Sequence, residues 1–187
     1  MGEDDDLARR AAAGDRRALS QLLERHTDRI HALCRRVVGN PDDALDASQE
    51  AMIAVARGIG GFDGRSAFTT WLYRVVTNAA LDELRRRRRR PLPVGDALTE
   101  PAVVRSALDE QVGARLDVDA ALRALPEEFR VAVVLRDLLD LDYAEIAAVL
   151  DLPPGTVRSR IARGRAALRE LLGNPQAAGD RRSGGHD

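Results

Sequence analysis

The chain of 187 residues is poor in the residues on which several protein classes depend. Its single cysteine, Cys34, excludes an internal disulfide and a cysteine-based zinc site, and it indicates a reducing compartment. Aromatic residues make up 3% of the sequence, which disfavours a β-sandwich and favours small helical units. The apolar runs are too short to span a membrane. Residues 1–6 are acidic where a secretory signal needs positive charge, so we expect a cytoplasmic protein.

Lysine is also absent, so all 29 basic residues are arginines, set against 30 acids. The near-zero net charge conceals strong segregation along the chain. Residues 117–151 hold three arginines and nine acids, whereas residues 152–172 hold five arginines and one acid. Blocks of opposite sign indicate separate surfaces for separate partners, and arginine suits contacts with phosphates and base edges.

The apolar pattern predicts an all-α fold of two small helical domains joined by a flexible acidic linker. Apolar residues at three- and four-residue spacing from Leu19 to Val37 predict a helix of about five turns, which Gly39-Asn40-Pro41 ends. Further helices are expected over about 43–57 and 68–90. The expected divisions are a disordered acidic segment (1–6), a first domain (7–90), a linker with three prolines (91–116), a second domain (117–172) and a disordered tail (173–187).

The second domain contains a predicted helix-turn-helix over about 143–163. A short helix from Tyr143 to Leu150 precedes a tight turn, after which Thr156 is placed to cap the next helix. On that helix one face is apolar, and we expect it to pack inward through Ile161, Gly164, Leu168, Leu171 and Leu172. The remaining surface carries Arg158, Ser159, Arg160 and Arg163. This pattern predicts insertion into a DNA major groove; the alternative is an αα-hairpin with a solvated basic face.

Two patterns stand out in the first domain. Asp46, Gln49 and Glu50 share one helical face, which is either a binding patch or plain solvated surface. Further along, a glycine-containing loop leads into a helix on which Arg74, Asn78 and Asp82 recur at four-residue intervals.

Aromatic residues and a run of arginines border that second pattern. Phe68 and Trp71 could hold an unstacked base, although such residues more often belong to a core. The six arginines at 85–90 favour a phosphate contact over a solvated tail.

Taken in order, these features resemble a bacterial sigma factor of the extracytoplasmic-function (ECF) family, actinobacterial and nearest its sigma M branch. Asp46–Glu50 resembles region 2.2, and Phe62–Arg86 resembles regions 2.3 and 2.4. Ala124–Arg130 resembles the opening of region 4, and Gly155–Arg165 resembles the recognition helix of region 4.2. The resemblance covers about residues 7–172.

The resemblance implies a transcription initiation factor that binds core RNA polymerase and directs it to promoters by reading their −10 and −35 elements. The residues that match the polymerase-binding motif, which contacts the clamp helices of the β′ subunit, are Asp46, Gln49 and Glu50. Those implied to contact the −10 element are Phe62, Gly64, Ser66, Phe68, Arg74, Asn78, Asp82, Arg85 and Arg86. Those implied to contact the −35 element are Thr156, Arg158, Ser159, Arg160 and Arg163.

Two departures from the family pattern affect base preference. Ala162 is smaller than the side chain that many members carry, and Asp63-Gly64-Arg65 replaces the more usual Arg-Gly-Glu order. The base preference of the loop is therefore not transferred.

The resemblance also implies partners. Core polymerase (its β′ clamp helices and β subunit) and promoter DNA are expected, and an anti-sigma factor is a further candidate. Free in solution, the two domains are expected to be mobile, or docked together with their DNA-reading faces hidden.

Two other classes of function remain to be weighed. A stand-alone helix-turn-helix regulator explains residues 143–172 but leaves the first domain without a task. An enzyme would need a catalytic set, and His26, His31 and Cys34 lie on one helix; His26 belongs to its apolar stripe, so packing is favoured. We therefore expect no enzyme activity, no cofactor, no metal and no small-molecule substrate.

Overall fold

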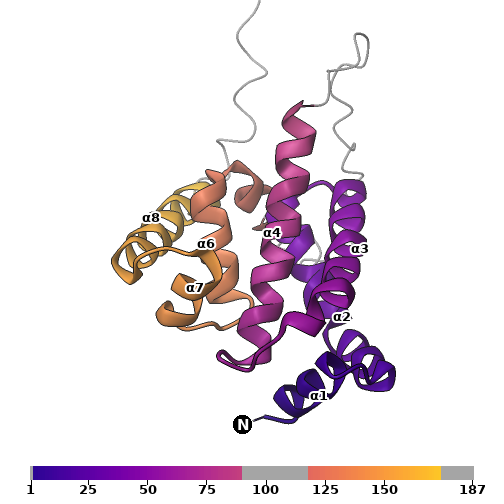
Figure 1. The fold of residues 1–187 in the computed structure, drawn as a ribbon. Helices are drawn as coiled ribbons and strands as arrows, with labels where there is room; N and C mark the ends of the chain where they lie inside the picture. The colour runs from indigo at the N-terminus through magenta and orange to yellow at the C-terminus, as the bar shows by residue number, and fades with distance from the viewer. Residues whose placement is uncertain (1, 90–117, 174–187) are drawn as a thin grey trace, which may run out of the picture.

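The computed structural model describes residues 2–89 and 118–173, and within these ranges every regular element is a helix. The first body consists of α1 (Glu3–Ala12), α2 (Arg16–Val38), α3 (Pro41–Gly58), a short 3-10 turn (Ile59–Gly61) and α4 (Phe68–Arg89). The second consists of a helical segment at 118–124 followed by α6 (Glu127–Asp137), α7 (Tyr143–Leu150) and α8 (Pro154–Gly173). The all-α prediction with two helical domains is confirmed (Figure 1). The predicted linker at 91–116, Arg90, and residues 174–187 of the predicted tail lie outside the described residues.

Local signals in the sequence explain where the long helices begin and end. The Asp15 carboxylate accepts hydrogen bonds from the backbone N–H groups of Arg17 and Ala18, which caps α2. Gly39 closes that helix with φ +80°, a left-handed conformation that glycine adopts without strain. Asn40 then caps α3, whose first residue is Pro41. The predicted boundary at Gly39-Asn40-Pro41 is therefore confirmed.

Residues 3–6 are helical, contrary to the expectation of a disordered segment at 1–6. Residues 3–6 form the first turn of α1, and Leu7, Ala8 and Ala11 on the same helix are buried. Acidic side chains in a first turn interact favourably with the positive end of the helix dipole, so the four acids stabilise a helix here. The acidic composition suggested disorder because a count of acids does not show that they lie in the first turn of a helix.

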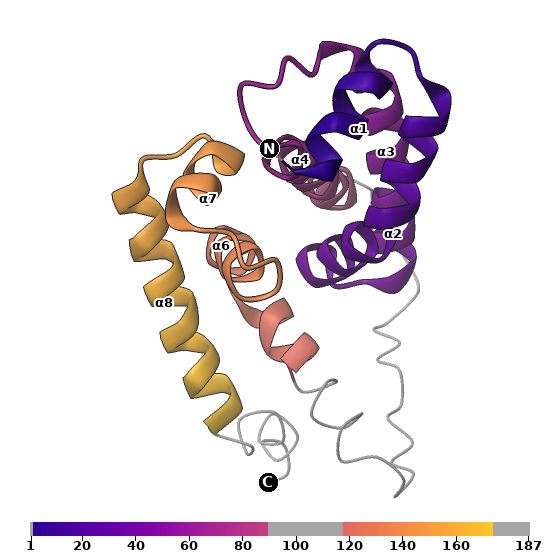
Figure 2. The same cartoon turned by 90° about the horizontal axis from the view of Figure 1, so that it is seen from below.

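The two bodies pack against each other, with α7 beside α4 and α6 beside α2 (Figures 1 and 2). Polar contacts cross the junction. Arg130 reaches from α6 to the backbone carbonyl of Val37, and Arg88 at the end of α4 pairs with Glu127 at 2.8 Å. Asp119 pairs with Arg35 at 3.1 Å and with Arg36 at 2.9 Å. This docking agrees with one of the two expected arrangements of the domains.

The docking does not hide the outward face of α8, so the expectation of covered DNA-reading faces is wrong for that helix. Arg158, Ser159 and Arg163 all remain exposed in the docked arrangement. The second body meets the first mainly through the 118–124 segment, α6 and α7, which leaves the outward side of α8 open to solvent. Among the described helices, none has a stretch both long and apolar enough to cross a bilayer.

Candidate nucleic-acid interface

The helix-turn-helix forms where the sequence predicts it, with α7 and α8 joined by Asp151–Pro153. Asp151 adopts a left-handed conformation (φ 53°) that reverses the chain. One side of α8 is buried through Val157, Ile161 and Gly164. A Cβ on Gly164 would lie 2.6 Å from a methyl of Val133, so only glycine allows α8 to approach α6 this closely.

The outward side of α8 presents polar side chains to solvent. Ser159 and Arg163 are exposed on the side opposite the buried face, and Arg158 is exposed on the flank beside them. Arginine can donate two hydrogen bonds to a guanine edge, and serine can bond to a base or a phosphate. The surface therefore has the chemistry and the exposure that a major-groove helix needs.

Two predicted residues of this helix lie elsewhere than expected. Thr156 does not cap α8, because the helix begins at Pro154 and Thr156 lies half-buried inside the first turn. Proline suits the first helical position, since its fixed φ is already helical and it has no N–H to satisfy.

Arg160 is half-buried and lines a cavity of about 440 Å³ together with Leu81, Arg88 and Glu127. Arg160 thus faces the junction between the two bodies in this arrangement.

The end of α8 also departs from the expected packing. Leu171 and Leu172 are 37% and 45% exposed, although the helical pattern placed them on the inward face. The inward face is covered mainly by α6, and the buried residues of α8 end at Gly164.

Tyr143 is a residue of this surface that the sequence reasoning missed. Its ring lies 5.5 Å from the guanidinium carbon of Arg136 and 5.9 Å from that of Arg158. Cation–π contact at these distances restricts the arginine side chain before DNA is present. The available signal was a lone aromatic residue at the start of the first helix of the motif.

Arg165 is held by a neighbouring carboxylate. Its guanidinium donates two hydrogen bonds to Asp137 on α6, and this pairing raises its pKa. Arg165 therefore ties α8 to α6, while Arg158 and Arg163 remain on the outward face.

On the first body, α4 presents the expected polar stripe. Arg74, Asn78 and Asp82 are all exposed, one turn apart, while Leu72, Val76 and Ala80 of the same helix are buried. The loop before the helix, Asp63–Ala67, is exposed throughout, and Gly64 in it has φ +72°. The loop, which includes Ser66, and the exposed stripe of α4 therefore follow one another along the chain, and both are open to solvent.

The two phenylalanines at the ends of this loop belong to the core, which corrects the expectation that they contact a base. Phe62 is 7% exposed and Phe68 is 1% exposed. Their rings meet edge to face with 6.0 Å between centroids, and Trp71 stacks on Phe68 at 5.9 Å. Burying two large aromatic side chains is favourable because it removes apolar area from water, so both rings stay in the core. From there they fix the two ends of the loop.

The arginine run beyond the stripe is extensively paired with acids. Arg85 pairs with Asp82, Arg86 with Glu83 at 3.2 Å, Arg87 with Asp43 at 3.3 Å and Arg88 with Glu127 at 2.8 Å. All four arginine side chains are more than half exposed. Of these four pairs only Arg85–Asp82 is exposed on both sides, so it is the weak pair whose acid a phosphate can displace most readily.

A third surface lies on α3. Asp46, Gln49 and Glu50 are exposed as predicted, whereas Ala47, Ser48, Ala51 and Val55 of the same helix are buried. Two large apolar side chains, Leu45 (50% exposed) and Ile53 (41% exposed), lie on the exposed side of the same helix. Exposed apolar residues bordered by charge are typical of a protein-binding surface.

Comparison with known proteins assigns both bodies to one family. The family model for sigma-70 region 2 matches residues 22–90, and the model for sigma-70 region 4 matches residues 115–168. The chain is 42% identical over 171 residues to the ECF RNA polymerase sigma factor SigM of Mycobacterium tuberculosis, covering 91% of this chain and 85% of that protein. This agrees with the predicted sigma M resemblance.

Solved structures of similar proteins share the arrangement of helices. CnrH, solved in complex with the cytosolic domain of CnrY, matches with a TM-score of 0.71 and 29% identity, covering 93% of this chain and 99% of that one. The sigma factor RpoE of Bartonella quintana, solved with the anti-sigma factor NepR, matches with a TM-score of 0.67 and 26% identity, covering 83% and 97%. The chain therefore belongs to the extracytoplasmic-function sigma factors of bacterial RNA polymerase.

Proposed function

We propose that this chain acts in the cytoplasm as a transcription initiation factor that binds core RNA polymerase and directs it to promoters with specific −10 and −35 elements. The observation that carries the proposal is the exposed outward face of α8, where Arg158, Ser159 and Arg163 lie together behind a tight turn. That face reads the −35 element in the major groove, and Tyr143 orients Arg158 toward it. Thr156 contributes from the first turn of α8, and Arg160 contributes when the second body moves away from the first.

The −10 element is bound by α4 and the loop before it. Arg74, Asn78 and Asp82 are exposed beside a loop that contains Gly64 and Ser66, so hydrogen-bonding groups are available to a base that leaves the stack. Arg85 contacts a phosphate once the exposed Asp82 is displaced, and Arg86 contacts one through the exposed half of its side chain. Phe62 and Phe68 act from the core, by holding the ends of the loop.

Core polymerase is bound by the exposed side of α3. Asp46, Gln49 and Glu50 supply charge and amide groups to the clamp helices of the β′ subunit, and Leu45 and Ile53 supply apolar area. Residues 7–90 thus form the polymerase-binding and −10-binding domain, and residues 117–172 form the −35-binding domain. An anti-sigma factor is a further partner, by analogy with the RpoE–NepR complex. The polymerase performs the chemistry, so the chain itself needs no catalytic group.

Run-off transcription with core polymerase and a promoter library tests the proposal. Adding the chain should direct initiation to a subset of promoters that share two motifs, and sequencing the 5′ ends of the transcripts would define both. Core polymerase alone is the control. Unchanged start sites would contradict the proposal, and tight promoter binding without polymerase would favour a stand-alone regulator.

A further inference from the structure

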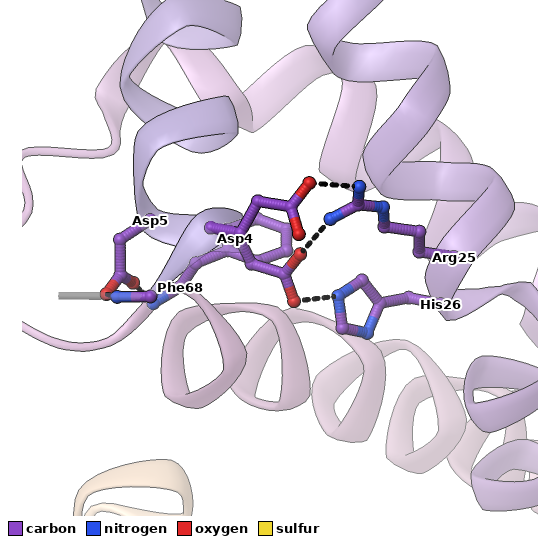
Figure 3. A network of polar contacts seen from close by, with 7 residues as sticks. Asp4, Asp5, Arg25, His26 and Phe68 are labelled. Carbon is purple, nitrogen blue, oxygen red and sulfur yellow. Dashed lines mark hydrogen bonds and ion pairs between the residues drawn. The ribbon is translucent and has the colours of Figure 1, made fainter.

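One carboxylate links the starts of two helices that are far apart in the sequence. Asp5 accepts a hydrogen bond from the backbone N–H of Gly2, before α1, at 3.0 Å. Its other oxygen accepts from the backbone N–H of Phe68, the first residue of α4, at 2.8 Å (Figure 3). The Phe68 N–H and then the Gly2 N–H lower the pKa of this carboxyl, because both bonds favour the ionised form.

The start of α4 depends on this contact because its own sequence provides no cap. The first N–H groups of a helix have no partner within the helix and usually bond to a side chain just before it. The residue before Phe68 is Ala67, which has no side-chain acceptor. Asp5, 63 positions earlier, supplies the missing acceptor.

The neighbouring acid fixes the ring of the same phenylalanine. Asp4 accepts from Arg25 at 3.1 Å and lies 2.9 Å from Nε2 of His26, which is buried (Figure 3). The His26 ring packs edge to face on Phe68, with 5.5 Å between centroids. Successive residues of α1 therefore act on Phe68 from two sides, Asp5 on its backbone and Asp4 on its ring through His26.

Phe68 also marks the point where the exposed loop Asp63–Ala67 joins α4. The far end of that loop is fixed by the buried Phe62, whose ring contacts Phe68. The near end is fixed by Asp5. A loop of this length can present a defined surface only if both of its ends are held.

We propose that Asp5 is a positioning residue for −10 recognition, because it holds the N-terminus of α4 and thereby sets how the loop Asp63–Ala67 meets promoter DNA. The proposal rests on the function proposed above for that loop. It assigns to the acidic first turn of α1 a role in promoter discrimination without direct contact with DNA. Asp5 should therefore influence base preference at the −10 element and leave the −35 element and polymerase binding unaffected.

The test compares Asp5→Ala with Asp5→Asn in the full chain, using run-off transcription with core polymerase. The template is a promoter found with the wild-type chain, together with single-base variants at −10 and −35. Asp5→Ala should lower the preference for the original −10 base over its variants by up to about tenfold, the factor by which losing one helix cap shifts the folding equilibrium of a first turn. Asp5→Asn should lose clearly less preference than Asp5→Ala, because its single amide oxygen can still accept the Phe68 N–H although its NH2 group cannot accept from Gly2.

The matched control is Asp6→Ala, which removes an adjacent exposed acid that pairs with Arg9 at 3.7 Å. It should behave as wild type. Equal losses at −10 and −35 variants in Asp5→Ala, or a −10 preference that does not change, would overturn the role of Asp5 while the wild-type chain still initiates normally. A wild-type chain that directs no initiation would instead overturn the proposed function, and this role with it.

Discussion

Arg130 donates a hydrogen bond from its guanidinium to the backbone carbonyl of Val37 over 2.7 Å, which joins α6 of the second body to the end of α2 in the first. The Arg130 side chain is buried and donates a second hydrogen bond to the carbonyl of Leu125 at 3.3 Å. Burial lowers the pKa of this guanidinium, although arginine stays charged at any physiological pH. The bond to Leu125 fixes this buried cation within the second body, and the bond to Val37 then holds the two bodies in one orientation.

Replacing Arg130 with Ala should loosen the docked arrangement. Two buried carbonyls would lose their donor, at a cost of about 1–3 kcal/mol. We expect the radius of gyration measured by small-angle X-ray scattering to increase. Arg169→Ala, at an exposed arginine of α8, is the control. An unchanged radius would show that other contacts hold the bodies together.

Arg163→Ala should weaken binding to −35 DNA by about 1–3 kcal/mol and relax discrimination at one base pair. The reason is that Arg163 is exposed on the outward face of α8. Binding to a set of single-base variants by fluorescence anisotropy measures both effects, again with Arg169→Ala as the control. A uniform loss on all sequences with a flatter salt dependence would indicate a phosphate contact instead.

Changing Gln49 to Ala together with Glu50 to Lys should weaken association with core polymerase by a few kcal/mol, about the cost of introducing a repelled charge at an interface. The two side chains are exposed on α3, so the fold should be unaffected. Titration of labelled chain with core polymerase gives the affinity. Glu24→Lys, an exposed acid on α2, is the charge-matched control. Equal affinities for both variants would remove α3 from the interface.

Cys34 should make the stability of the chain pH-dependent in alkali. Burial raises the pKa of its thiol from 9.0 to about 11. The folded state therefore retains the proton that the unfolded state loses, and stability falls as pH rises from about 9 to about 11, by about 2–3 kcal/mol. Urea unfolding of wild type and Cys34→Ala at several pH values measures the difference. A constant difference between the two across this range would contradict the prediction.

The sequence predicted the fold well where the information was local. The apolar stripe of α2 and the Gly39-Asn40-Pro41 boundary depend on residues close together in the chain, and both were correctly predicted. The exposed positions of Arg74, Asn78 and Asp82 also follow from helical spacing alone. Apart from the cap predicted at Thr156, the main errors concern contacts with other elements of the fold.

Three of these errors illustrate the physical reason. The acids at 3–6 form a helical turn because their partners, Arg25, His26 and the N–H of Phe68, come from other helices. Phe68 is buried because Phe62, Trp71 and His26 surround it. Leu171 and Leu172 lie on the same side of α8 as its buried residues, but they are exposed because α6 does not extend far enough to cover them. Apart from Trp71, which lies one turn after Phe68 on the same helix, none of these packing partners can be identified from residue spacing.

The pairing of Arg85–Arg88 with acids of the chain itself has a consequence for how the chain searches for its targets. A free polycation binds DNA by releasing one condensed counterion for nearly every phosphate it neutralises, and this gain is independent of sequence. Here the carboxylates of Asp82, Glu83, Asp43 and Glu127 already act as built-in counterions. Contact with phosphate then exchanges one anion for another and releases fewer ions. The run consequently retains the chain on random DNA less strongly than its charge suggests, and leaves it free to reach the polymerase.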